Sequence, residues 1–229
     1  MQLVYAVFEF AVFLFSVSCH ECAHAWMASR LGDQTARLQG RITLNPLNHI
    51  DPVGTLLFPA IMLFAPLFMF GGGGLALGWG KPTPVMTRNF RNITRDINLS
   101  TAAGLAAHLV LVLLALVFLV VLNRVLPEDG FQGDLANEIF LNSAPQALIM
   151  LAVLAIKVNV TLFLFNLLPI PPLDGGRILR NLLPYSALET FDQISRFSAV
   201  VSCIVGAFWV NLLLDPALRV VFAILNRFT

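Results

Sequence analysis

The chain has 229 residues, of which 58% are hydrophobic and only 12% are charged, about half the charged fraction of an ordinary soluble domain. A soluble protein of this composition would expose large apolar patches and associate, and the composition also excludes a disordered chain or a disulfide-stapled secreted module. Fourteen Lys and Arg residues against 13 Asp and Glu residues give a net charge of +1, which leaves no basic surplus for nucleic acid. We therefore expect one integral membrane domain over residues 1–229, with no nucleic-acid partner.

In chain order, the first apolar stretch covers residues 2–28 and is long enough to cross a bilayer as a helix, since about 20 residues suffice. No basic residue precedes it and histidines stand where a signal peptide would carry its small-residue cleavage site, which argues against a removable leader. Residues 53–70 are a second apolar segment. With them, the chain is predicted to be an all-α membrane protein with five to six hydrophobic segments, the others being 99–122, 146–168, 197–214 and a short apolar tail at 216–228.

The path of residues 53–70 has two alternatives. The segment contains two prolines and runs into four consecutive glycines, which weaken a continuous helix. If it crossed the membrane fully, the basic loops 29–52 and 71–98 would lie on opposite sides. If it dips in and returns, both basic loops are cytoplasmic and the acidic loop 123–145 lies outside, as the positive-inside rule favours. We favour the re-entrant path, in a multi-pass protein of the cell membrane.

Between the first two apolar segments, residues 36–44 alternate apolar and polar side chains over part of their length, and Asn45-Pro46 ends the pattern. Alternation with a period of two is typical of a half-buried strand. The sequence therefore predicts a small strand or hairpin at the membrane face.

The chemistry of the chain centres on His20, Glu21 and His24, which form an H-E-x-x-H motif inside the first span. Residues four apart on a helix share a face, so both imidazoles can bind one metal ion, with the carboxylate beside them to take a proton from water. Two histidines and a glutamate are costly at membrane depth unless they are paired or liganded. The motif therefore predicts a zinc site.

A catalytic zinc ion needs a third protein ligand, and the candidates are His49, His108 and, most strongly, Asp174. Asp174 belongs to the sequence N-L-L-P-I-P-P-L-D-G-G, just after an apolar span. Its prolines are expected to end the helix and to hold the chain extended. The alternative is that Asp174 only caps a helix that begins near Gly175.

The H-E-C-A-H motif in a membrane helix, followed about 150 residues later by N-x-x-P-x-P-P-L-D-G-G, resembles the site-2 protease family (peptidase family M50) of intramembrane zinc metalloproteases. The resemblance implies that His20, His24 and Asp174 bind one zinc ion. It also implies that Glu21 is the general base and later the acid, and that Asn166 helps to hold the substrate or the tetrahedral intermediate. Three further stretches resemble a compact prokaryotic branch without a PDZ domain, namely residues 40–46, 49–55 and 78–82.

Two positions leave alternatives open. Asn166 can donate an amide hydrogen to a developing oxyanion or form an interhelical hydrogen bond, and we weigh these interpretations equally. The family's A-G-P-x-x-N motif reads A-G-L-A-A-H here, with Leu105 and His108 in place of proline and asparagine. We interpret His108 as a packed neutral imidazole, in preference to an additional site residue.

Two further charged residues, Glu9 and Lys157, lie within apolar spans, on the two helices that carry site residues. Both are expected toward the outer leaflet, where an ion pair between them would join the helices. The alternative is that Lys157 reaches the outer interface and Glu9 is protonated.

Together these patterns predict a zinc metalloendopeptidase that cleaves within or near the transmembrane segment of a membrane-protein substrate. Its partners would be that substrate and the lipid bilayer, and its active site would lie toward the cytoplasmic side. The alternatives are a catalytically impaired, zinc-binding regulatory protein and, less favoured, an ion transporter that uses buried His, Glu and Asp as a relay.

Overall fold

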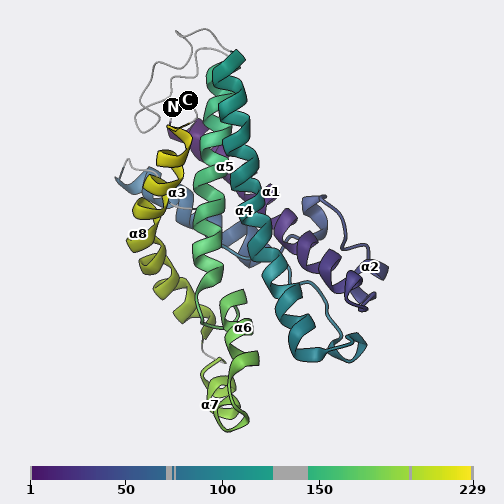
Figure 1. Ribbon diagram of the computed structural model, residues 1–229. Helices are drawn as coiled ribbons and strands as arrows, with labels where there is room; N and C mark the ends of the chain where they lie inside the picture. Colours follow the sequence, from purple (N-terminus) through teal and green to yellow (C-terminus); the bar gives the residue numbers. More distant parts are fainter. Residues whose placement is uncertain (1, 71–73, 75, 126–143, 196–197, 228–229) are drawn as a thin grey trace.

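The computed structural model describes residues 2–70, 74, 76–125, 144–195 and 198–227, and these are mostly helical with no strand among them (Figure 1). Within these residues, four helices are long and apolar enough to cross a membrane: α1 (Gln2–Arg30), α4 (Ile93–Val125), α5 (Ala144–Leu167) and residues 204–225 of α8 (Ser198–Leu225). The prediction of an all-α membrane protein is confirmed.

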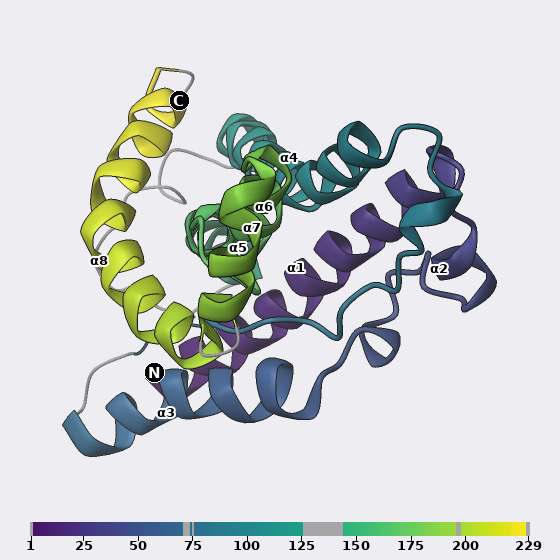
Figure 2. The same cartoon turned by 90° about the horizontal axis from the view of Figure 1, so that it is seen from below.

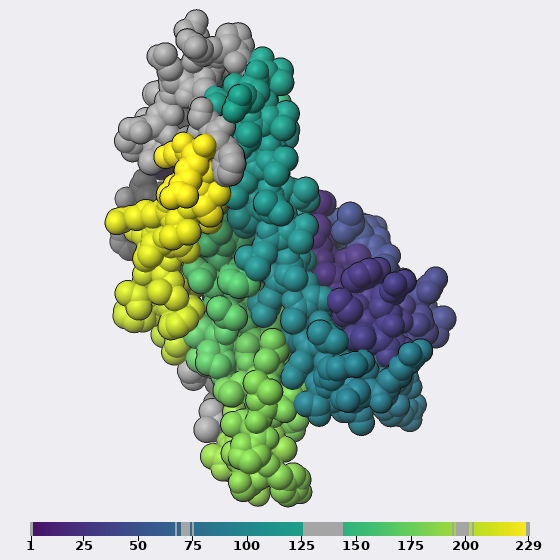
Figure 3. All heavy atoms as spheres, viewed as in Figure 1, coloured from purple at the N-terminus to yellow at the C-terminus, as the bar shows by residue number. Residues whose placement is uncertain are grey.

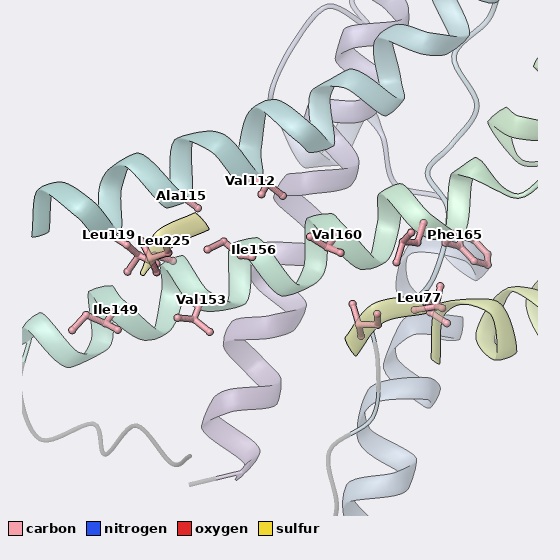
Figure 4. Packing of buried hydrophobic residues seen from close by; sticks show 14 of the residues in the cluster. Leu77, Val112, Ala115, Leu119, Ile149, Val153, Ile156, Val160, Phe165 and Leu225 are labelled. Carbon is pink, nitrogen blue, oxygen red and sulfur yellow. The ribbon is translucent and has the colours of Figure 1, made fainter. Parts of the chain in front are cut away.

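Helix α5 is the central element of the bundle, packed against α1, α4 and α8 (Figure 2). It is apolar on all sides, as a helix enclosed by others must be. Its residues Ile149 and Ile156 are buried toward Leu119 of α4, whereas Phe165 lies near Leu77 at the other end of the same cluster (Figure 4). Helix α4 instead turns a row of large apolar side chains outward, as expected of a helix that faces lipid: Leu109, Val110, Leu113, Leu114 and Val117.

The second apolar segment leaves and returns at the same end. A π-helical stretch, Pro52–Leu57, leads into α3 (Phe58–Phe70). Residues 76–86, the return segment, then run back beside the start of this segment, where the Trp79 N–H donates to the Gly54 carbonyl at 3.1 Å and the Lys81 N–H to the His49 carbonyl at 2.8 Å. This is the path that a re-entrant segment requires, and its depth in a membrane stays a prediction.

The strand or hairpin predicted at residues 36–44 is wrong. The chain forms a one-turn helix, α2 (Thr35–Leu38), then a turn in which Gly40 has a φ of +68°, and later a 3-10 turn, Pro46–Asn48. The helix begins there because Asp33 accepts hydrogen bonds from the backbone and hydroxyl of Thr35. Arg41 points inward and donates to the carbonyls of Asn48, Lys81 and Pro82, contacts that local alternation does not encode.

The separate apolar tail predicted at 216–228 is also wrong, because α8 runs without interruption from Ser198 to Leu225 with Pro216 inside it. A proline removes one helical hydrogen bond, but it is tolerated in membrane helices, where neighbouring groups satisfy the freed carbonyl. The two apolar segments are therefore one long helix.

The two ends of the bundle differ in structure. The start of α1 and the end of α8 belong to the same end of the bundle but lie well apart within it, whereas α6 (Asp174–Leu182) and α7 (Tyr185–Ser195) project from the other end (Figures 1 to 3). The end of α1, helix α2 and a 3-10 turn, Thr87–Asn89, also lie on that side. The H-E-x-x-H motif near the end of α1 and the first residue of α6 are thus brought toward each other.

Candidate metal centre and active site

Three potential metal ligands converge where α1 meets α6. The Nε2 atoms of His20 and His24 lie 2.9 Å apart, and Asp174 Oδ2 lies 3.3 Å from the first and 3.2 Å from the second. All three residues are buried, and among the described residues they form the only such group of His, Cys, Asp and Glu side chains. The third ligand predicted from sequence is therefore placed beside the first two.

The donor set and its spacing fit zinc. A tetrahedral zinc ion with ligands at about 2.1 Å separates neighbouring ligand atoms by about 3.4 Å. The three distances in this cluster fall within about half an ångström of that value. Two imidazoles with one carboxylate are also a common catalytic zinc set, in which a fourth position stays open.

Helix α4 holds the His24 ring in the orientation that metal binding needs. The Ser100 carbonyl lies 2.8 Å from His24 Nδ1, so Nδ1 carries the proton and Nε2 offers its lone pair to a metal. One turn further along α4, Gly104 lets the ring approach closely, since a Cβ there would lie 2.3 Å from His24 Nε2. A glycine on this face is thus required by the metal centre itself.

Asp174 is the first residue of α6 and follows a turn at the end of α5. The prolines before it do not hold the chain extended as expected, because the Leu173 N–H donates back to the Ile170 carbonyl at 3.1 Å. Gly175 permits this turn, since a Cβ would lie 2.2 Å from the Leu167 carbonyl oxygen. Burial raises the pKa of the Asp174 carboxyl, but the His24 and His20 imidazoles outweigh it and hold that pKa well below its ordinary value. The carboxylate is ready to bind a cation.

Glu21 is held by the return segment. The Thr83 N–H donates to Glu21 Oε2 at 3.0 Å, and the Thr83 hydroxyl lies 2.8 Å from the same oxygen. The backbone is close on this side as well, because a Cβ at Gly80 would lie 2.9 Å from Glu21 Cγ. Arg41 fixes this part of the return segment through the carbonyls of Lys81 and Pro82. The carboxylate predicted to act as a base therefore has a defined position.

A cavity of about 200 Å³ lies beside His20 and Glu21. Its wall is mostly apolar, and it combines the end of α5 and the α5–α6 turn with α1 and the return segment. Asn166 is part of this wall, and its amide donates to the Leu162 carbonyl of its own helix at 3.0 Å, which differs from the interhelical bond considered above. The wall includes His20, Glu21, Trp79, Gly80, Asn166 and Arg177.

The other two histidines lie outside the ligand cluster. His49 is buried with Nε2 at 2.9 Å from the Thr43 carbonyl oxygen. His108 is packed against His20 with 4.8 Å between ring centroids, and it also lines the cavity. Its environment thus combines the packed imidazole that we expected with a place in the site wall.

The predicted pairing of Glu9 with Lys157 is confirmed. Lys157 Nζ lies 3.2 Å from Glu9 Oε2 and 5.6 Å from the centre of the Tyr5 ring. Glu9 Oε1 also accepts the Ala76 N–H at 3.4 Å. The cluster joins α1 and α5 to the start of the return segment.

Comparison with known proteins identifies the family. Residues 8–209 match the model of Peptidase family M50. The chain belongs to this family. This M50 peptidase is therefore a zinc metalloprotease, and the His20, His24 and Asp174 cluster provides a site that fits the metal.

Curated relatives carry the same description. The M50 peptidase is 33% identical to "Putative zinc metalloprotease YwhC" of Bacillus subtilis, over 81% of this chain and 74% of that protein. It is also 33% identical to "Putative zinc metalloprotease Rip2" of Mycolicibacterium smegmatis, over 78% of this chain and 55% of that one. The chain thus spans only about half the length of that second relative. No solved structure matches it.

The sequence reasoning missed two residues of the site, Thr83 and Ser100. Thr83 follows directly after the G-W-G-K-P stretch, which carried the resemblance but had no assigned role. Ser100 lies four residues before Gly104 and therefore on the same face of α4. This is the face against which His24 packs. The roles of Thr83 and Ser100 can be recognised only from their contacts with segments that are distant in sequence.

Proposed function

We propose that this M50 peptidase hydrolyses a peptide bond within or beside the transmembrane segment of a membrane-protein substrate. The observation that carries the proposal is the position of the ligand cluster and Glu21, which are buried among apolar helices long enough to span a bilayer. A site enclosed in this way is suited to a substrate that arrives from the lipid phase.

In this proposal, His20, His24 and Asp174 hold the zinc ion. When bound there, zinc polarises the scissile carbonyl and makes water a better nucleophile at neutral pH. Glu21 accepts the proton of the attacking water and later gives it to the leaving amine. Thr83 keeps the Glu21 carboxylate oriented for both transfers.

Asn166 is proposed to contact the substrate. One of its two amide hydrogens is used within α5, and an amide has a second hydrogen that can donate toward the cavity that Asn166 lines. An amide donor near the scissile carbonyl would stabilise the negative charge that develops on the oxygen. The side chain would therefore lower the barrier without binding the metal.

The substrate helix must unwind locally before cleavage, because its own hydrogen bonds protect the backbone carbonyls. We propose that this occurs near the cytoplasmic face of the cell membrane, since α2 and the 3-10 turn Thr87–Asn89, which carry Arg37 and Arg88, lie toward the end of the bundle that holds the site. The lipid bilayer and one transmembrane substrate would be the partners.

The test compares wild-type membranes with membranes that carry Glu21→Gln, using proteomics to detect membrane-anchored fragments that accumulate as uncleaved stubs. The variant should keep its zinc, measured by metal analysis of the purified protein, and lose at least 100-fold in cleavage rate, the low end for a general base. Glu189→Gln, on the exposed surface of α7, is the matched control and should behave as wild type.

Three results would contradict the proposal. Equal cleavage by wild type and Glu21→Gln would remove Glu21 from the reaction. Retained zinc with no cleavage by either protein would indicate a regulatory metal protein. Metal or proton flux in vesicles without proteolysis would indicate a transporter.

A further inference from the structure

His108 has a place in the active site that the metal-binding and proton-transfer roles do not use. It is 1% exposed, it lines the cavity, and its ring stacks on that of His20 at an interplanar angle of 25°. It is not part of the group of ligand atoms that lie within 4.8 Å of one another. The imidazole therefore stands beside the metal centre without belonging to it.

A hydrogen-bond network fixes which ring nitrogen of His108 carries the proton. Asn159 donates its amide hydrogens to Ser16 Oγ at 3.0 Å and to the Ala155 carbonyl at 2.8 Å. If the Asn159 amide were rotated by 180°, its oxygen would face the Ala155 carbonyl oxygen, and neither atom could donate. The amide nitrogen must therefore face that carbonyl. Asn159 Oδ1 is thus an acceptor, and it lies 2.9 Å from His108 Nδ1. Nδ1 therefore donates.

The consequence lies at the other nitrogen. A neutral imidazole that is protonated at Nδ1 has its lone pair on Nε2, and a charged ring would be costly at this depth. Nε2 of His108 is buried and has no partner among the described residues. Leaving a buried acceptor unsatisfied is unfavourable, and a ligand with a suitable donor would satisfy it.

We propose that His108 is a hydrogen-bond acceptor of the active site, whose Nε2 receives an N–H or O–H donor from the molecule that occupies the cavity. Two sources share this chemistry, a peptide N–H of the bound substrate and a water molecule. Asn159 and Ser16 are positioning residues, because they act only by holding the ring in the tautomer that accepts. This inference rests on the zinc site and is independent of whether the peptidase cuts within the membrane.

The experiment measures the ¹⁵N chemical shifts of the histidine side chains in the full-length, zinc-loaded Glu21→Gln protein, in which no turnover is needed. His108→Asn, which restores the asparagine of the family motif, identifies the His108 signals by their loss. The ring should be protonated at Nδ1 and unprotonated at Nε2. In the Asn159→Leu variant, the side chain cannot accept from His108 Nδ1, so a substantial fraction of the His108 rings should be protonated at Nε2 instead. In Asn159→Asp, the His108 ring should stay protonated at Nδ1.

Adding a peptidyl hydroxamate, a zinc-directed peptide mimic, then separates the two sources. If the donor is a peptide N–H, the His108 Nε2 signal should move to the chemical shift of a hydrogen-bonded nitrogen only when the hydroxamate is added. It also predicts that His108→Phe, which keeps the stacked ring but not the acceptor, weakens hydroxamate binding by about 10-fold. If the donor is water, the His108 Nε2 signal should already be that of a hydrogen-bonded nitrogen before the hydroxamate is added. The affinity for the hydroxamate should then be nearly the same in His108→Phe as in the protein with His108.

A proton on Nε2 in the wild-type ring, or a lone pair that stays unbonded with and without hydroxamate, would overturn the proposal. Zinc content and thermal unfolding of each variant are measured alongside. If His108→Phe loses zinc or fails to fold, the chemical shifts in the Glu21→Gln protein still decide between the outcomes. Failure here would leave cleavage by the peptidase intact, so the two proposals are tested separately.

Discussion

At the scale of single residues, the orientation of Glu21 depends on a threonine that is distant in sequence. The Thr83 hydroxyl lies 2.8 Å from Glu21 Oε2, and a hydrogen bond to a charged group contributes about 1.5–3 kcal/mol. Thr83→Val should therefore reduce kcat by at least 10-fold while zinc content stays unchanged. Purified variants with a peptide substrate and metal analysis provide the measurement.

Thr83→Ser is the matched control for this prediction, because it keeps the hydroxyl and removes only a methyl group. It should retain most of the wild-type kcat. Equal rates for the valine and serine variants would show that the hydroxyl has no part in orienting Glu21, and that the bond from the Thr83 backbone at 3.0 Å is sufficient.

At the scale of elements, the pair of Glu9 and Lys157 fastens α1 to α5. Removing one partner of a buried pair is strongly destabilising, although Lys157 is one quarter exposed and the effect is reduced accordingly. Glu9→Gln should thus lower the thermal unfolding midpoint in detergent by several degrees. The double variant Glu9→Leu with Lys157→Met should recover most of this loss, and a fully stable single variant would contradict the role of the pair.

Asp33, in the loop between α1 and α2, links this loop to Met86 and Asn89. Burial raises the pKa of Asp33, but hydrogen bonds from Thr35, Asn89 and the Met86 backbone outweigh it, so the folded-state pKa lies below the ordinary value of 3.8. The carboxylate therefore stabilises the folded state above that value, and the contribution is lost as pH falls through the lower folded-state pKa.

Asp33→Asn should consequently be less stable than wild type at neutral pH, with the difference shrinking as the solution becomes acidic. Thermal unfolding of both proteins across this pH range gives the measurement. A difference that stays constant or grows on acidification would show that the ionised carboxylate is not what holds the loop.

At the scale of the whole molecule, the return of residues 76–86 beside residues 49–54 predicts a membrane topology in which both flanks of this segment lie on one side. In a background without Cys19, Cys22 and Cys203, we expect cysteines placed at Leu38 and Arg88 to react with an impermeant maleimide only in inverted vesicles. Val125→Cys, at the opposite end of α4 and 74% exposed, should react in intact cells. Labelling of Leu38 and Arg88 variants from opposite sides would show that the segment crosses fully.

How far the sequence predicts this molecule depends on the range of the interactions involved. Apolar length identifies α1, and helical spacing with the L-D-G motif identifies His20, His24 and Asp174. These signals are local or chemically distinctive. By contrast, the one-turn helix at residues 35–38 depends on Asp33, which also accepts from the backbone 53 residues away. Thr83 contacts Glu21 across 62 residues, and no pattern within one segment encodes such a contact.

The meeting of α1 and α6 has a consequence for the chain as a polymer. An ion bound by His24 and Asp174 would cross-link positions about 150 residues apart and close a loop that includes most of the bundle. Because such a loop restricts the unfolded ensemble and the ion binds only the assembled site, its binding energy also becomes folding energy. Removing the ion with a chelator would then destabilise the folded protein as well as stop turnover, so the catalytic ion would also have a structural role.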